Sequence, residues 1–91
     1  MSKLSRKESM AIATIHDALR ELRLKGMNAN VEMRSETISI KVYPDTEEEA
    51  RNIKKILCFF RDEKDDIDIK HFPSSDGFTE FYIVELRKWM A

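Results

Sequence analysis

Few residues in this sequence are of the kinds that phosphate and nucleotide sites require. The 91 residues include only two glycines, Gly26 and Gly77, and these lie far apart. Phosphate-binding loops need several neighbouring glycines so that backbone amides can approach the anion. The sequence therefore excludes a P-loop and a dinucleotide-binding fingerprint.

Cysteine and long apolar runs are scarce as well. The single cysteine, Cys58, cannot form an internal disulfide. The N-terminal residues lack the apolar core of a signal peptide, and no apolar run approaches the roughly 20 residues that span a bilayer. We expect a cytoplasmic protein without a membrane-spanning segment.

Residues that could bind metal or take part in catalysis are isolated. His16, Cys58 and His71 lack the close spacing of zinc ligands or of a nucleophile and its base. The acidic stretch Asp62–Asp68 fails as a calcium-binding loop, because Pro73 stands where the bidentate glutamate is needed. We expect no metal, no cofactor, no small-molecule substrate and no enzymatic activity.

The composition is that of a globular protein. Hydrophobic residues make up 42% of the chain and charged residues 36%, and the length suits one domain over residues 1–91. The formal net charge of -1 provides no general attraction for nucleic acid.

Capping motifs and apolar periodicity predict two helices. Ser5 and Glu8 form a capping box and Gly26 is suited to a helix C-terminus, which predicts a helix over about residues 5–25. Thr46 and Glu49 form a second capping box, which predicts a helix over about residues 46–61. The side chains expected to face the core are Ile12, Ile15, Leu19 and Leu22 in the first helix and Ala50, Ile53, Leu57 and Phe60 in the second.

Four strands complete the pattern. Residues 30–43 alternate with a period of two and predict a hairpin whose connection lies near residues 34–37. Residues 67–72 predict a third strand, which is followed by a turn over Pro73–Gly77. Phe81–Val84 is apolar on both faces, which indicates an inner strand, a sheet surface covered by a partner, or both.

The order α-β-β-α-β-β predicts an α+β two-layer sandwich. Two helices would cover one face of a four-stranded antiparallel sheet and bury their apolar stripes there. Among such topologies we favour a circularly permuted ferredoxin-like arrangement.

Two surfaces are predicted to remain apolar after the helices have packed. Phe59 lies about 160° from Leu57 around the second helix, so its ring points away from the core. If the helices cover Ile38, Ile40, Ile67, Ile69, Phe81 and Ile83, the other face of the sheet carries Tyr43, Phe72, Tyr82, Val84 and Leu86, with Lys41 and Lys70 between them. Trp89 either extends this face or folds back onto a helix.

Two alternative functions are consistent with that face. In the first, the protein is a small adaptor, inhibitor or regulatory protein, such as the accessory proteins of phages, and it binds another protein or a second copy of itself as a homodimer. The residues expected to bind this partner are Tyr43, Phe59, Phe72, Tyr82, Val84, Leu86 and Trp89. In the alternative, the protein binds single-stranded nucleic acid: Tyr43, Phe72 and Tyr82 stack on bases, while Lys41, Lys70 and the basic first helix contact phosphates. The acidic balance of the chain favours the first function.

Overall fold

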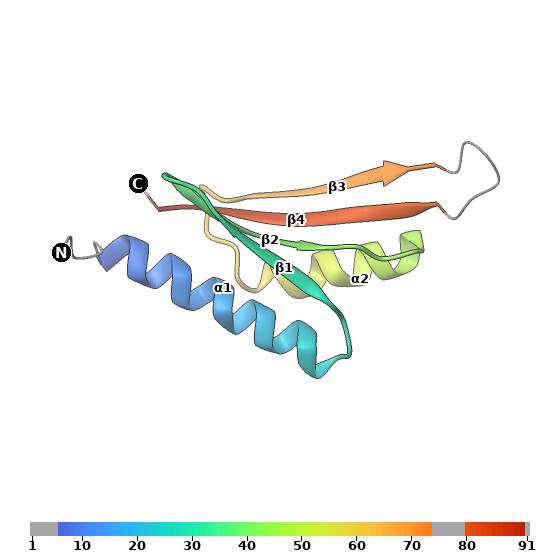
Figure 1. Ribbon diagram of the computed structural model, residues 1–91, viewed down its shortest axis with the longest axis horizontal. Helices are drawn as coiled ribbons and strands as arrows, with labels where there is room; N and C mark the ends of the chain where they lie inside the picture. Colours follow the sequence, from blue (N-terminus) through green and yellow to red (C-terminus); the bar gives the residue numbers. More distant parts are fainter. Residues whose placement is uncertain (1–5, 74–79, 91) are drawn as a thin grey trace.

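The computed structural model describes residues 6–73 and 80–90 and has two layers (Figure 1). Helices α1 (Arg6–Leu24) and α2 (Glu47–Cys58) lie on one face of a four-stranded antiparallel sheet. The strands are β1 (Ala29–Met33), β2 (Thr37–Val42), β3 (Asp66–Phe72) and β4 (Phe81–Trp89). The predicted α+β sandwich and its element order are confirmed, and the permuted ferredoxin-like description stays a prediction.

The sheet has the order β1-β2-β4-β3, so the strand that comes last in the sequence lies in its interior. An inner strand was one of the predicted alternatives for the apolar segment Phe81–Val84, and this alternative is confirmed, whereas a covering partner stays a prediction. The strand is longer than that segment and runs on to Trp89. The hairpin connection predicted near residues 34–37 is also confirmed, because Arg34 N–H donates to Thr37 O at 2.8 Å between β1 and β2.

The helix ends follow the predicted capping residues. Gly26 has φ +78°, a left-handed conformation that glycine adopts easily, and Met27 N–H donates back to Leu22 O at 2.9 Å to close α1. Thr46 caps α2, since its hydroxyl accepts a hydrogen bond from Glu49 N–H at 3.2 Å. Ser5 and the turn after Pro73 lie outside the described residues. Within residues 6–73 and 80–90, no helix combines the length and the apolar character needed to cross a bilayer.

The core lies between the helices and the inner strands. α1 contacts β1 and β2, whereas α2 contacts β4 and β3 (Figure 1). The buried apolar residues are Ala11, Ile15, Ala18 and Leu22 of α1, Ala50, Ile53 and Leu57 of α2, Ile38, Ile40 and Val42 of β2, and Tyr82, Val84 and Leu86 of β4, with Met90 just beyond that strand. The predicted stripes of both helices therefore face the sheet, with Ile12 and Leu19 partly buried. The second helix ends at Cys58 rather than near residue 61, so Phe60 packs against the core from beyond the helix.

The predicted orientation of β4 is wrong by one residue. Tyr82, Val84 and Leu86 were expected on the open face, which is the face turned away from the helices, but they are 7%, 0% and 0% exposed on the helix side. Their cross-strand neighbours explain this: Val84 pairs with Val42 and Leu86 pairs with Ile40, and directly opposed residues share a face. Phe81 and Ile83, which were expected to face the helices, lie on the open face instead.

The cap of α2 can be tested by mutation. Thr46→Ala should lower the free energy of unfolding by about 1 kcal/mol, because Glu49 N–H loses its acceptor. Thr46→Ser keeps the hydroxyl and should remain close to wild type in urea denaturation followed by circular dichroism. Equal losses in both variants would show that the hydroxyl does not stabilise the helix.

Candidate functional site

The face of the sheet turned away from the helices is the main candidate for binding. The residue pairing places alternate side chains of each strand on it. These are Asn30 and Glu32 of β1, Thr37, Ser39 and Lys41 of β2, Asp66, Asp68, Lys70 and Phe72 of β3, and Phe81, Ile83, Glu85, Arg87 and Trp89 of β4. Tyr43 directly follows β2 on the same face. We call this surface the open face.

One end of the open face is aromatic. Phe72 and Phe81 stack with ring centroids 4.8 Å apart and planes 8° from parallel. Ile83 is two residues further along β4, and Tyr43 lies opposite Ile83 because Tyr82 N–H donates to Pro44 O and extends the strand pairing that far. Tyr43, Phe72 and Phe81 are 46%, 40% and 39% exposed. We call these four residues the aromatic end.

The middle of the open face is a row of paired charges. Lys41 Nζ lies 3.2 Å from Glu32 Oε2 and 4.0 Å from Glu85 Oε2. Arg87 Nη2 lies 3.4 Å from Glu85 Oε1, and Arg34 Nη2 lies 2.9 Å from Glu32 Oε1. The hydrogen bonds from Lys41 and then Arg34 hold the pKa of the Glu32 carboxyl below its usual value. These cations are therefore engaged by carboxylates of the same face.

Trp89 lies at the other end of the open face, eight residues along β4 from Phe81. At about 3.4 Å per residue, this separation is roughly 27 Å. The ring is 38% exposed. Trp89 therefore extends the face, as one of the two predicted alternatives stated, but it does not join the aromatic end.

A buried ion pair lies beneath Trp89. Lys88 and Asp65 have side chains that are 4% and 5% exposed, and Lys88 Nζ lies 2.5 Å from Asp65 Oδ2. Lys88 also donates to Phe60 O at 2.9 Å, and Asp65 Oδ2 accepts from Asp62 N–H at 2.8 Å. This network connects the end of β4 to the segment between α2 and β3, and it provides each of the two buried charges with polar partners.

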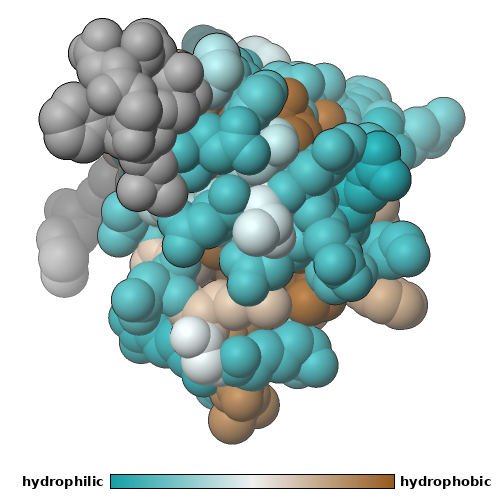
Figure 2. All heavy atoms as spheres, turned by 90° about the vertical axis from the view of Figure 1, so that its right-hand side faces the viewer, coloured by the Kyte–Doolittle hydropathy of each residue, from teal (hydrophilic) through white to brown (hydrophobic). Residues whose placement is uncertain are grey.

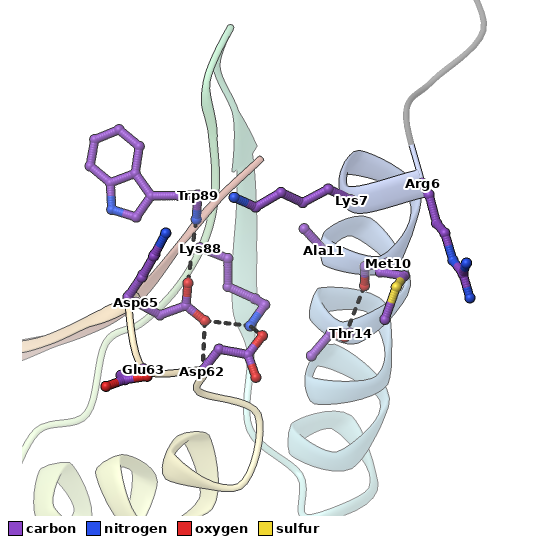
Figure 3. Close-up of a pocket in the computed structure, with 11 residues that line it drawn as sticks. Arg6, Lys7, Met10, Ala11, Thr14, Asp62, Glu63, Asp65, Lys88 and Trp89 are labelled. Carbon is purple, nitrogen blue, oxygen red and sulfur yellow. Dashed lines mark hydrogen bonds and ion pairs between the residues drawn. The ribbon is translucent and has the colours of Figure 1, made fainter. Parts of the chain in front are cut away.

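A cavity of about 540 Å³ opens next to this network. Its walls come from the first turns of α1, including Met10 and Thr14, and from the segment before β3 (Figure 3). Figure 3 shows Lys88 directed toward Asp62 and Asp65, with the Trp89 ring on the other side of the strand. Because the buried lysine is fully partnered, the cavity contains no unpaired buried charge that would attract a ligand.

Phe59 occupies a separate surface. It caps α2 and is 88% exposed, so the predicted outward direction is confirmed. The end of the molecule where α2 begins is mainly hydrophilic, and its hydrophobic residues form small separate patches (Figure 2). Phe59 follows the C-terminal end of α2 in the helix layer, whereas the aromatic end lies on the opposite face of the sheet, so the two do not belong to one surface.

The described residues bring together no cluster suited to metal chemistry. Across residues 6–73 and 80–90, no group of three or more His, Cys, Asp or Glu side chains could hold a metal ion. His71 stacks on Tyr82 with centroids 4.5 Å apart, and its Nε2 lies 3.1 Å from Glu80 Oε2. This arrangement gives His71 a packing role within the β3 and β4 pair.

The structure brings together some of the predicted binding residues. Tyr43 and Phe72 share the aromatic end, and Lys41 and Lys70 lie on the same face. Sequence reasoning missed Phe81 and the buried pair of Lys88 and Asp65. The polar residues Glu85 and Arg87 on either side of Leu86 were a signal that could have oriented β4 correctly, whereas nothing local to Lys88 or Asp65 predicts their contact. No protein-family model matches the chain, and no similar sequence is found among curated proteins.

The buried pair predicts a large effect on stability. Lys88→Met leaves Asp65 buried without its cation and should cost about 3–5 kcal/mol of unfolding free energy. The exposed pair of Arg51 and Glu47 is the control, and Arg51→Met should cost less than about 0.5 kcal/mol. Asp65→Asn combined with Lys88→Met should recover part of the loss in urea denaturation, because the amide oxygen still accepts from Asp62 N–H. Equal losses of unfolding free energy for Lys88→Met and Arg51→Met would contradict this prediction.

The paired charges predict a titration shift. Because its folded pKa is lowered, Glu32 contributes stability above its unfolded pKa, and that contribution is lost as the pH falls through its folded pKa. Lys41→Met should raise the titration midpoint of Glu32 measured by carboxyl NMR. Lys70→Met removes a cation that does not contact Glu32 and should leave the midpoint unchanged. A Glu32 midpoint insensitive to Lys41 would disprove the pairing.

Proposed function

We propose that the protein is a non-enzymatic interaction module that binds another protein through the open face of its sheet. The observation that carries this proposal is the exposed aromatic stack of Phe72 and Phe81 beside Tyr43 and Ile83. Aromatic side chains are enriched in protein interfaces, where they commonly serve as anchors. An adaptor, inhibitor or regulatory protein needs such an anchor and no catalytic group.

The surroundings of the aromatic end suit a protein partner. Apolar anchors in protein interfaces are commonly surrounded by polar groups that exclude water and set orientation. Here Lys70 is the cross-strand neighbour of Ile83, and the paired charges of Lys41, Glu85 and Arg87 begin next to it. The fitting partner presents an aliphatic or aromatic side chain flanked by polar groups of both signs.

Nucleic acid is less well suited to this face. Carboxylates outnumber cations among its strand residues: Glu32, Asp66, Asp68 and Glu85 against Lys41, Lys70 and Arg87. Tyr82, which was one of the three predicted stacking residues, is buried. Phosphate binding depends on cations that are available to the backbone, and Lys41 is already held by two carboxylates.

The proposal can be tested with matched variants as bait. Proteins from the source cells that bind the wild type should be lost with Phe81→Ser and retained with Phe59→Ser, which removes an equally large ring from a separate surface. A recovered partner should then bind purified Phe81→Ser at least about tenfold more weakly, because Phe81 is an anchor. Circular dichroism should show both variants folded.

Two results would count against the proposal. In the first, the partner binds Phe81→Ser and wild type equally and loses affinity with Phe59→Ser. In the second, single-stranded oligonucleotides bind the wild type with steep salt dependence while no protein is recovered specifically.

A further inference from the structure

Strand β3 forms one edge of the sheet and leaves backbone groups unpaired. Along β4, Tyr82 N–H donates to Pro44 O and Met90 N–H donates to Glu36 O, so the even-numbered residues of this strand bond toward β2. In an antiparallel ladder the backbone groups of successive residues point to alternate sides, so the odd-numbered residues bond toward β3. The register then directs the N–H and C=O groups of Ile67, Ile69 and His71 away from β4.

The charges along this edge are also uncompensated. Asp68 faces Glu85 across the strand pair and lies two residues from Asp66 on the same face. Among the residues that the structure describes, neither the Asp68 carboxylate nor the Lys70 ammonium group has a hydrogen-bond or ion-pair partner. Lysine and aspartate at an edge commonly prevent association. In this strand, however, Asp68 and Lys70 are placed so that each can lie opposite the other when two copies of the edge pair antiparallel.

We propose that the β3 edge pairs with the β3 edge of a second copy of the chain, antiparallel and centred on Ile69. Each Ile69 then bonds to the other, and Ile67 bonds to His71 of the second copy, which uses all three outward-facing residues. On the open face, Asp68 lies opposite Lys70 of the second copy, and the same contact occurs twice. These are non-hydrogen-bonded pairs, in which the side chains approach most closely.

The positions of the charged residues favour this register over the two adjacent registers. Moving the centre by one residue toward the N-terminus places Asp68 opposite Asp68, and moving it one residue the other way places Lys70 opposite Lys70. Like charges in directly opposed positions destabilise a strand pair. A register centred on Ile69 avoids both and converts two isolated charges in each copy into ion pairs.

The surroundings of the edge can accommodate a second copy. In Figure 1, β3 lies at the side of the sheet farthest from α1, with no other described element beyond it. Ile69 is 37% exposed and would be covered. A hollow of about 350 Å³ between α2 and β3 lies beside Ile67, where His71 of the second copy would be placed. This surface is distinct from the aromatic end, so the inference does not rest on the proposed function.

The second edge of the sheet is less suited to self-pairing. On β1, the pairing of Arg34 with Thr37 directs Ala29, Val31 and Met33 outward. The only charged residue of that strand, Glu32, is already paired with Lys41 and Arg34. Self-pairing of β1 would therefore gain no new ion pair.

Charge reversal tests the proposal. Sedimentation velocity over a range of concentrations should show a dimer of the wild type that weakens as salt is raised. Asp68→Lys and Lys70→Asp each place like charges opposite one another and should raise the dimer dissociation constant at least about tenfold. The double variant with both reversals restores opposite charges and should recover dimerisation. Asp17→Lys on α1 and Lys55→Asp on α2 make the same charge changes on exposed helix positions and should have no effect.

Amide hydrogen exchange locates the contact. The amides of Ile67, Ile69 and His71 should become more protected as the concentration of wild-type protein rises, while the outward amides of Val31 and Met33 should not. The proposal is overturned if the wild type stays monomeric throughout the concentration range or if both single reversals dimerise as strongly as the wild type. It is also overturned if the double variant fails to recover dimerisation. Protection that appears only when a different protein is added would indicate a strand from that protein instead and would also overturn it.

Discussion

Hydrogen bonding along both sides of β4 determines which side chains of the sheet face the helices and which lie on the open face. Its even-numbered residues bond to β2 and its odd-numbered residues bond to β3, so the direction of each side chain follows from the same alternation. Val84 and Leu86 are buried on the helix side of the sheet because of it, and Phe81 and Ile83 lie on the open face. A shift of one residue would bury Glu85 and Arg87 and expose the apolar centre of the core. The residues of the core and those of the open face are therefore determined by the same register.

The placement of charge divides the molecule into satisfied and unsatisfied regions. Lys88 and Asp65 are buried, and each has several polar partners. Lys41, Glu32, Glu85 and Arg34 form a linked row in the middle of the open face. At the β3 edge, by contrast, Asp68 lies beside other carboxylates. Since like charges in neighbouring strands destabilise a strand pair, an opposite charge from a partner would be favourable at this edge.

Local signals in the sequence predicted most of the fold. Thr46 with Glu49, Gly26, and the spacing of Ile15 and Leu22 each depend on physics within one or two turns, so the helices and their inner faces could be found without tertiary information. The orientation of β4 failed because Phe81–Val84 is apolar on both sides and gives no preference when considered alone. The contact of Lys88 with Asp65 joins residues 23 positions apart and depends on how the segment after α2 returns to the sheet. Two of the residues predicted on the open face, Tyr43 and Phe72, lie there, whereas the predicted Tyr82, Val84 and Leu86 are buried on the helix side.

The interior position of β4 also bears on how the chain folds during synthesis. β3 pairs with β4 and with no other described strand, and β2 lacks its inner neighbour until β4 is present. While the ribosome is still making residues 81–89, the hairpin of β1 and β2 can form, but β3 has nothing to bond to and the faces of both helices remain incompletely covered. A stop codon that removed β4 would therefore leave β3 without a pairing strand and the hairpin of β1 and β2 as the only pairing among the described strands.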